Sequence, residues 1–391
     1  MVEEDNQSYS LGVNTRASTS MDNGVVDNGT GVESEIVDAD QSIVEPFDPK
    51  MIRVETRPST IDLLLARVKH GELDLAPGFQ RKAGIWKEAA QSKLIESILI
   101  RIPLPAFYID ATDDERWLVV DGLQRLTALR RFVLDESLSL TGLEFLSDLH
   151  GKTYKDLPRN LQRRIDETQV TVYLIEKGTP PAVKFNIFKR INTGGLPLSA
   201  QEIRHALNQG QASECLVELA DSREFKEATN NGVRDERMTD RECVLRCLAF
   251  MIVPYTDYRV PDLDNFLNNT MAAMNKMPKH EVDSLKYRFT RAMTAASLIF
   301  GRDAFRKRFH RDDARKPINR ALFEAWSVNL DRLGEEQLHL LEGRKDQVID
   351  KFIALMGKPE FDSAISQGTG DINKVRIRFG QVQDLINEVL Q

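Results

Sequence analysis

The chain has 391 residues, 41% of them hydrophobic, and its 53 basic and 60 acidic side chains give a formal net charge of −7. That apolar content supports a folded core and excludes a chain that is disordered throughout, while the length predicts two or three domains. Eleven acids but only two bases lie in residues 1–50, so the remaining chain is nearly neutral and an anionic partner is not excluded.

Residues 1–50 differ in composition from the rest of the chain. They are rich in Ser, Thr, Asn, Gly and acids, with Tyr9 and Phe47 as their aromatic residues. Such a segment buries too little apolar surface to offset its conformational entropy, so we predict a disordered acidic tail. The start MVEEDNQSYS has neither the basic nor the apolar region of a signal peptide, and no apolar run is long enough to span a bilayer. We therefore expect a cytoplasmic protein without a membrane partner.

The next part of the chain, 51–207, mixes helical and strand patterns. A helix is predicted from Ser59–Asp62 to a Gly71 cap, and another from about Lys87. Runs rich in β-branched and aromatic residues predict strands, and further helices are predicted around them. The predicted strands are Ala106–Ile109, Trp117–Val120 and Val170–Ile175, and the further helices begin at Leu126, Val183 and the capping box Ser199–Glu202. We predict an α+β domain over 51–207.

From about Asn208 to the end the pattern is almost entirely helical, with breaks at isolated Gly and Pro residues. Cys243 and Cys247 stand four residues apart in an apolar helical stretch. That spacing favours reduced thiols in a core over a disulfide or a metal site. We predict a mostly helical domain over 208–391.

The most informative local pattern is the strand-to-helix turn formed by residues 121–125. Gly122 permits a tight turn with exposed amides, and the following helix directs the positive end of its dipole to the same point. Arg125 supplies a planar fork suited to phosphate oxygens, and Asp121 could orient that arginine, a Mg²⁺ ion or a hydroxyl. The pattern predicts a phosphate site. The alternative is that Asp121 caps the helix and Arg125 pairs with a nearby acid.

A second pattern lies between residues 188 and 204. Asn192 and the two glycines after it tolerate left-handed backbone, so this loop can turn its amides outward. Arg190 and Arg204 flank the loop, and Glu202 is available as an acid or an orienting group. The alternative is a helix–loop–helix connection in which Glu202 only closes the capping box.

A third arginine, Arg81, lies in a loop that contains Pro77 and Gly78. It stands shortly before Trp86, so packing of the guanidinium against the indole is an alternative to an anion contact. Both interpretations stay open.

Together these stretches resemble the DUF262 family, the N-terminal domain type of the GmrSD modification-dependent restriction enzymes, related to the ParB/sulfiredoxin-like fold. The resemblance rests on four motifs in the family's order: PGFQRKAGIW, QSKLIESILIRIPLPAFYI, VVDGLQRLTALRRF and FNIFKRINTGGLPLSAQEIRHAL. It covers roughly 57–210, and the helical remainder is similar to the family's usual extension. It implies a ParB/sulfiredoxin-like N-terminal domain followed by a mostly helical C-terminal domain.

The resemblance also implies a nucleotide-binding, NTP-hydrolysing domain that acts in bacterial DNA restriction or phage defence. GTP or ATP, with Mg²⁺, is the expected cofactor. Asp121, Gln124 and Arg125 would be catalytic, Gly122 and Arg125 would bind phosphate, and Asp121 would hold the metal. The neighbouring motifs would add nucleotide contacts from Arg81, Arg190, Asn192, Glu202 and Arg204. The family usually has Gln where this chain has Leu123, which removes a polar donor and favours binding over hydrolysis.

Many relatives carry a C-terminal HNH nuclease, but the six histidines here form no HNH-like pair. If DNA is cut, a separate nuclease or modification-sensing subunit is the expected partner. The basic segment Arg302–Lys316 is a candidate DNA-backbone contact, with a solvated helix face as the alternative. Phe305 and Phe309 within it are predicted to be core residues and not base-stacking platforms. The competing function is therefore a non-catalytic DNA-binding or regulatory module of ParB-like fold.

Overall fold

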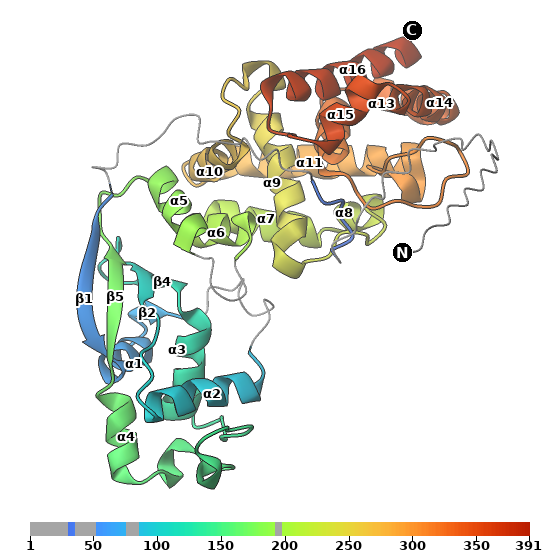
Figure 1. Cartoon of the computed structure of the whole chain (residues 1–391). Coiled ribbons are helices and arrows are strands. Elements are labelled where there is room, and N and C mark those ends of the chain that lie inside the picture. Colours follow the sequence, from blue (N-terminus) through green and yellow to red (C-terminus); the bar gives the residue numbers. More distant parts are fainter. Residues whose placement is uncertain (1–29, 36–51, 76–85, 192–197) are drawn as a thin grey trace, which may run out of the picture.

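The computed structural model describes residues 30–35, 52–75, 86–191 and 198–391. Figure 1 shows a sheet with helices at lower left and a helical body at upper right. Two helices, α5 (Pro181–Ile191) and α6 (Ala200–Leu207), lie between the two parts. The predicted α+β class with a mostly helical C-terminal part is confirmed.

The sheet has five strands in the order β1-β5-β3-β4-β2, with mixed parallel and antiparallel pairs. The strands are β1 (Val54–Thr60), β2 (Leu73–Asp74), β3 (Phe107–Asp110), β4 (Trp117–Asp121) and β5 (Gln169–Ile175). The three predicted strands are confirmed to within a residue. β1 was not predicted; it contains Pro58 and lies at the sheet edge, where a missing N–H is tolerated.

One face of the sheet is covered by four helices. In β5, alternate residues Val170, Val172 and Leu174 join a buried cluster with these helices, as the two-residue period of a strand requires. The opposite face is only partly covered, because Val120 and Ile175 pack under α5 and α6 near one end of the sheet. The covering helices are α1 (Ile61–Lys69), α2 (Glu88–Leu99), α3 (Leu123–Leu129), which continues into a π-helical turn over Arg130–Leu134, and α4 (Arg159–Asp166).

Local capping signals are confirmed where the sequence predicted them. The Thr60 side chain accepts a hydrogen bond from the Leu63 N–H at 3.3 Å at the start of α1, and Gly71 follows its end with φ +75°. Ser199 and Glu202 form the predicted capping box, with the two reciprocal bonds at 3.1 and 2.6 Å. These signals depend on neighbours in sequence, which is why the sequence reveals them.

The helical part encloses one large hydrophobic core, in which Cys243 and Cys247 are buried and free, as predicted, and so is Cys215. Across the described ranges, no helix combines the length and apolar character that crossing a bilayer requires. The helices are α7 (Gln211–Asp221), α8 (Arg223–Ala228), α9 (Thr239–Ile252), α10 (Leu263–Met274), α11 (Lys279–Phe300), α12 (Arg320–Asp331), α13 (Glu335–Gly343), α14 (Lys345–Met356), α15 (Pro359–Ser366) and α16 (Ile372–Leu390).

Residues 30–35, part of the segment predicted to be a disordered tail, pack against the helical part. Val32 is fully buried and forms a parallel bridge with Ile318. The prediction of disorder therefore fails for these six residues. The acidic composition suggested disorder, but the acids of this segment are paired with buried cations that lie far away in the sequence.

Glu96 gives a pH-dependent test of the α+β domain. Its carboxylate is 3% exposed and accepts hydrogen bonds from the amides of Glu144, Phe145 and Leu146, at 2.7–3.0 Å. Burial raises the pKa of Glu96, but these amides lower it further, so the net shift is downward. A lowered pKa stabilises the fold above the unfolded value of about 4.3, and this contribution disappears as the pH falls through the folded-state pKa.

We expect Glu96→Gln to cost about 2 kcal/mol at pH 7, because the charge-assisted bonds are lost. The difference from the parent should shrink as the pH falls below about 4, because the parent carboxylate is then protonated as well. Urea unfolding of the parent and the variant at pH 7 and at acid pH measures the loss of stability and its decrease with pH. Glu144→Gln, an exposed carboxylate paired with Lys93, is the matched control with an expected change under about 0.5 kcal/mol. A deficit that does not vary with pH would contradict this account.

Candidate functional site

The strand-to-helix turn has the geometry that its sequence predicts. Gly122 adopts φ +98° between β4 and α3, and a Cβ atom there would overlap the ring of Phe107. The N-cap residue of α3, Gly122, has no side chain to cap the helix, whose first internal bond runs from the Leu126 N–H to the Gly122 carbonyl. The amides of residues 123–125 thus lie at a helix start without an N-cap side chain, where an anion is favoured.

Arg125 has internal partners on the side where phosphate was expected. Its guanidinium donates to the carbonyl oxygens of Pro105 and Ala106 and to the Asp121 carboxylate, the last at 2.8 Å, and it lies over the Phe107 ring. The side chain is 10% exposed. This arrangement favours the alternative in which Arg125 pairs with a nearby acid. The arginine ties the start of α3 to the segment that leads into β3.

Asp121 stays partly accessible, with 24% of its side chain exposed. Burial raises the pKa of Asp121, and the charge of Arg125 and the Gly122 amide offset this only in part. Burial also lowers the pKa of Arg125. Both shifts show that the pair lies in a weakly solvated position, where charge interactions with a ligand are stronger than in water.

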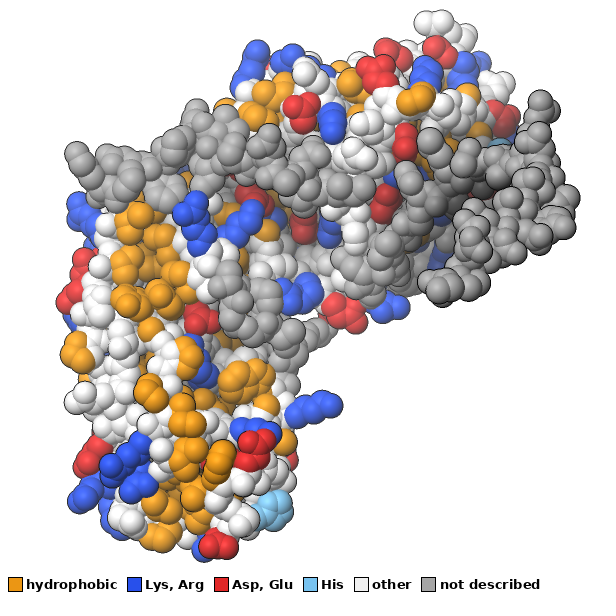
Figure 2. All heavy atoms as spheres, in the orientation of Figure 1, with side chains coloured by type: hydrophobic (Ala, Val, Ile, Leu, Met, Phe, Trp, Pro, Cys, Tyr) orange, Lys and Arg blue, Asp and Glu red, His pale blue; other side chains and the backbone are white. Residues whose placement is uncertain are grey.

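An irregularity in the pairing of β3 with β4, between Tyr108 and Ile109, places Asp121 opposite Tyr108 at the end of a row of paired residues. Tyr108 of β3 is opposite Asp121, Tyr173 of β5 is opposite Tyr108, and Thr56 of β1 is opposite Tyr173. The two tyrosine rings stack with centroids 4.7 Å apart, and both are half-buried. Figure 2 shows hydrophobic side chains gathered over this part of the sheet, beside β5.

Tyr108 and Tyr173 were not among the predicted site residues. The available signal was alternation, because Tyr108 stands between buried Phe107 and Ile109 and must therefore face the other side of the sheet. What the alternation does not show is that β3 and β5 are neighbours, which brings Tyr108 and Tyr173 together.

The remaining residues of the turn also have structural contacts. The Gln124 side-chain oxygen accepts a hydrogen bond from the Trp86 amide at 3.2 Å, and so fixes the chain where α2 begins. Leu123 packs against the buried cluster between the sheet and its helices. The position that is usually Gln in the family therefore serves the core here.

The second predicted cluster divides into buried and exposed members. Glu202 is 1% exposed, closes the capping box and pairs with Arg237 at 3.1 Å. Arg204 is equally buried and pairs with Asp264 of α10 at 2.8 Å, so it ties α6 to the helical part. Arg190 is exposed at the end of α5. Arg81 and Asn192, also predicted site residues, lie outside the described residues.

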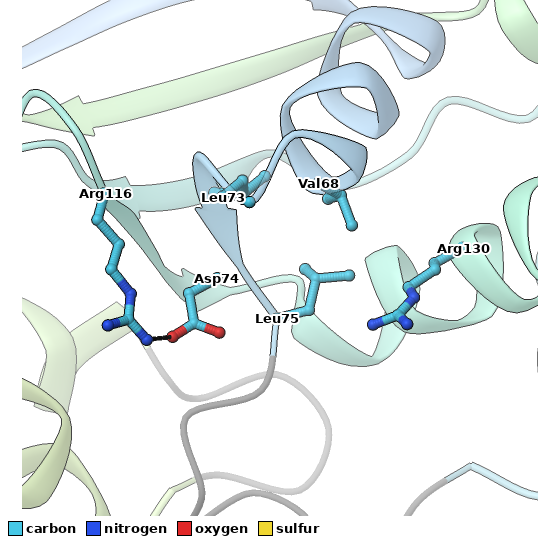
Figure 3. Close-up of a pocket in the computed structure, with 7 residues that line it drawn as sticks. Val68, Leu73, Asp74, Leu75, Arg116 and Arg130 are labelled. Carbon is cyan, nitrogen blue, oxygen red and sulfur yellow. Dashed lines mark hydrogen bonds and ion pairs between the residues drawn. The ribbon is translucent and has the colours of Figure 1, made fainter.

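A separate hollow of about 400 Å³ opens beside α1 and β2. Figure 3 shows Arg116 and Arg130 on opposite sides of it, with the apolar side chains of Leu73 and Leu75 between them. Arg116 pairs with Asp74, and Arg130 pairs with Asp135 at 3.1 Å. Among the residues that the structure describes, no predicted site residue lines this hollow, which is therefore separate from the strand-to-helix turn.

The basic segment Arg302–Lys316, a candidate DNA-backbone contact, combines buried, paired and exposed cations. Arg306 and Lys307 are buried, and Lys307 pairs with Glu33 at 2.8 Å. Arg311 pairs with two acids of α14, Asp346 and Asp350. Lys307 and Arg311 are thus neutralised within the fold, whereas Arg302 and Arg315 are exposed, so contact of this segment with DNA stays a prediction. Phe305 and Phe309 pack against the core, as predicted.

The described residues contain no group of three or more His, Cys, Asp or Glu side chains arranged to hold a metal ion. Asp121 is the one carboxylate of the turn. Mg²⁺ is commonly bound by one or two carboxylates together with substrate phosphates and water, so Asp121 fits a metal that arrives with a nucleotide. It does not fit a metal held by protein ligands alone.

Residues 62–208 match a protein-family model described as the GmrSD restriction endonuclease N-terminal domain. The matched range runs from α1 to just beyond α6 and includes the strand-to-helix turn and the capping box. Comparison with curated proteins finds no match.

Proposed function

Because residues 62–208 form a domain of the GmrSD N-terminal type, which belongs to restriction and phage defence systems, we propose that this chain binds a nucleoside triphosphate in that role. The observation that supports the proposal is the row of stacked tyrosines that ends at Asp121 beside the start of α3, which has no N-cap side chain. The domain would be of the ParB/sulfiredoxin-like type, as the resemblance implies.

The row offers different chemistry at its two ends. The aromatic surface of Tyr108 and Tyr173 suits a nucleobase, since stacking of a base on an aromatic side chain contributes about 1–3 kcal/mol. At the other end, the amides of the first turn of α3 suit phosphate oxygens. Asp121 would hold Mg²⁺ against those phosphates, or orient a water molecule. Arg190, exposed at the end of α5, is available as a cation.

Arg125 acts indirectly in this proposal. Its guanidinium holds Asp121 and the start of α3 in place through the contacts described above. It is thus a positioning residue rather than a phosphate ligand. Glu202 and Arg204 likewise hold α6 against its neighbours.

Binding without turnover is the second candidate, as expected of a regulatory module. Its support is the commitment of Arg125 and Arg204 to internal partners, together with Leu123 in the core. Phosphoryl transfer needs positioned cations to stabilise the developing charge. Release of phosphate from GTP or ATP, measured with and without DNA, separates the two candidates: no release above background supports binding alone.

Asp121→Asn tests the site, because the expected change in nucleotide affinity differs in direction with and without Mg²⁺. With Mg²⁺ present, we expect nucleotide affinity to fall at least about 10-fold, because the ion loses its protein carboxylate. Without Mg²⁺, affinity should stay equal or rise, because a negative charge near the phosphates has been removed. Titration of GTP and ATP by calorimetry under both conditions measures this.

Asp148→Asn, an exposed carboxylate of the same domain, is the control and should change neither titration. Tyr173→Ala, compared with Tyr173→Phe, tests the base end of the row. Equal nucleotide affinity of parent and Asp121→Asn protein in Mg²⁺ would rule out the proposed site.

A further inference from the structure

Residues 30–35, here called the strap, lie in the helical part like an added β-strand. The strap's Glu33 N–H donates to the Ile318 carbonyl at 2.8 Å, and the Ile318 N–H donates to the Gly31 carbonyl at 3.1 Å. On its other side, the Arg234 N–H donates to the Thr30 carbonyl at 3.0 Å. Figure 1 shows this short segment beside α8 and α9. Main-chain pairing of this kind is how many proteins bind extended peptides.

Two successive strap side chains, Val32 and Glu33, are buried, and the two that follow are partly exposed. Val32 is fully buried in the large core, while Ser34 is partly exposed. Glu33 pairs with Lys307 at 2.8 Å and accepts from the Asn319 amide at 3.0 Å. Glu35 pairs with Arg246 at 2.6 Å and accepts from the Thr369 hydroxyl at 2.9 Å. Each acid of the strap thus meets a cation that is itself buried.

Charge balance within the helical part favours an acid at the position of Glu35, whereas Lys307, the partner of Glu33, also pairs with Asp362 at 3.4 Å. Arg246 belongs to a chain of ion pairs that links the guanidinium groups of three arginines. Within the helical part, this chain contains Arg246, Arg320, Arg378, Glu242 and Glu324, so that cations exceed anions by one. Glu35 supplies the missing negative charge. A buried charge left without a partner is strongly unfavourable.

Backbone shape adds a further requirement. Gly31 adopts φ +78°, and a Cβ atom there would overlap the carbonyl oxygen of Gly232. The surface of the helical part that contacts the strap, here called the groove, therefore selects a residue type at each of positions 31–35. These are, in order, glycine, a buried aliphatic residue, an acid, a partly exposed residue and an acid. These are the properties of a sequence-specific peptide site.

We propose that the helical part is a receptor for an extended acidic peptide and that the strap is its ligand, bound in cis and exchangeable. The strap contributes only Val32 to the large core, whose other members come from residues 212–389. The helical core is thus nearly complete without it. Residues 36–51 join the strap to the α+β domain in the sequence. Binding of the strap to the helical part therefore fastens the α+β domain to the helical part at a second point. An exchangeable strap makes that fastening reversible, and a partner with the same Gly-Val-Glu-x-Glu pattern would displace it.

The test uses the full-length chain and a fluorescent peptide of residues 28–37. The parent protein should not bind the peptide, because its own strap occupies the groove at an effective concentration in the millimolar range. Full-length Val32→Asp protein, whose strap places a charge in the apolar pocket, should bind the parent peptide at a ratio of one to one. A peptide with Val32→Asp should bind at least about 10-fold more weakly, because the buried side chain is lost.

A second measurement covers the case in which Val32→Asp protein does not fold. A protease site inserted after Asp40 allows the folded parent to be cut, after which excess unlabelled peptide should replace the released fragment under native conditions. Exchange through a second copy, seen as a concentration-dependent dimer, also supports the receptor. The proposal is overturned if the folded variant binds no peptide, or if the cut fragment leaves only when the whole protein unfolds. None of these outcomes depends on nucleotide binding.

Discussion

Replacing Arg125 by alanine is expected to lower the free energy of unfolding by about 2–4 kcal/mol, because one guanidinium serves several buried partners. The substitution leaves the carbonyl oxygens of Pro105 and Ala106 without this donor and the Asp121 carboxylate without its counter-ion. It also removes the contact with the Phe107 ring. Urea unfolding of the full chain measures the loss.

Two further variants separate the role of Arg125 from the mere loss of a positive charge. Arg125→Lys keeps the charge but not the planar fork, so it should recover only part of the stability. Arg116→Ala removes an arginine whose side chain is 67% exposed and whose partner is Asp74, and it should change stability by less than about 1 kcal/mol. If Arg125→Ala unfolds like the parent but no longer binds nucleotide, the guanidinium is a phosphate ligand and the structural role assigned here is wrong.

The contrast between Gly122 and Arg125 shows what the sequence reveals. A tight turn between a strand and a helix requires φ > 0, so Gly122 is recognisable from its neighbours alone. The role of Arg125 depends on carbonyl groups 19 and 20 residues earlier in the chain. No local pattern indicates these contacts, because they arise only when α3 packs beside the segment that leads into β3.

The same distinction holds elsewhere in the site. Glu202 was recognised as a capping residue because its partner Ser199 is three residues away. Arg204 was predicted to contact nucleotide, whereas its acid partner Asp264 lies 60 residues further along, in another part of the fold. The tyrosine row depends on strand order and register, which are also set by distant contacts.

The strap is the case in which composition alone misled. Low hydrophobicity and many acids predict disorder when a segment is considered by itself. Here the acids offset buried cations. The negative charge that suggests disorder is therefore the property that the groove recognises. Sequence composition reports whether a segment can fold alone, and it does not report whether a folded partner needs its charge.

Arg246 allows this charge balance to be measured. Its side chain is 1% exposed, and it donates to Glu324 at 2.9 Å, to Glu35 at 2.6 Å and to Thr369 at 3.1 Å. We expect Arg246→Met to lower the free energy of unfolding by about 3–5 kcal/mol, because it leaves buried carboxylates without their shared cation. Burial lowers the pKa of Arg246, but the surrounding carboxylates raise it further, so the arginine stays charged.

The double variant Arg246→Met, Glu35→Gln distinguishes charge balance from packing. Removal of both charges restores neutrality to the chain of ion pairs, so the double variant should lose less stability than the sum of the single variants. In contacting pairs such coupling is typically about 0.5–3 kcal/mol, and a thermodynamic cycle over the four proteins measures it. Glu336→Gln, an exposed acid at the start of α13, replaces Glu35→Gln in a control cycle that should show no coupling. If the effects of Arg246→Met and Glu35→Gln are simply additive, the strap acid does not neutralise the buried arginine and its place in the groove depends on Val32 and the backbone bonds.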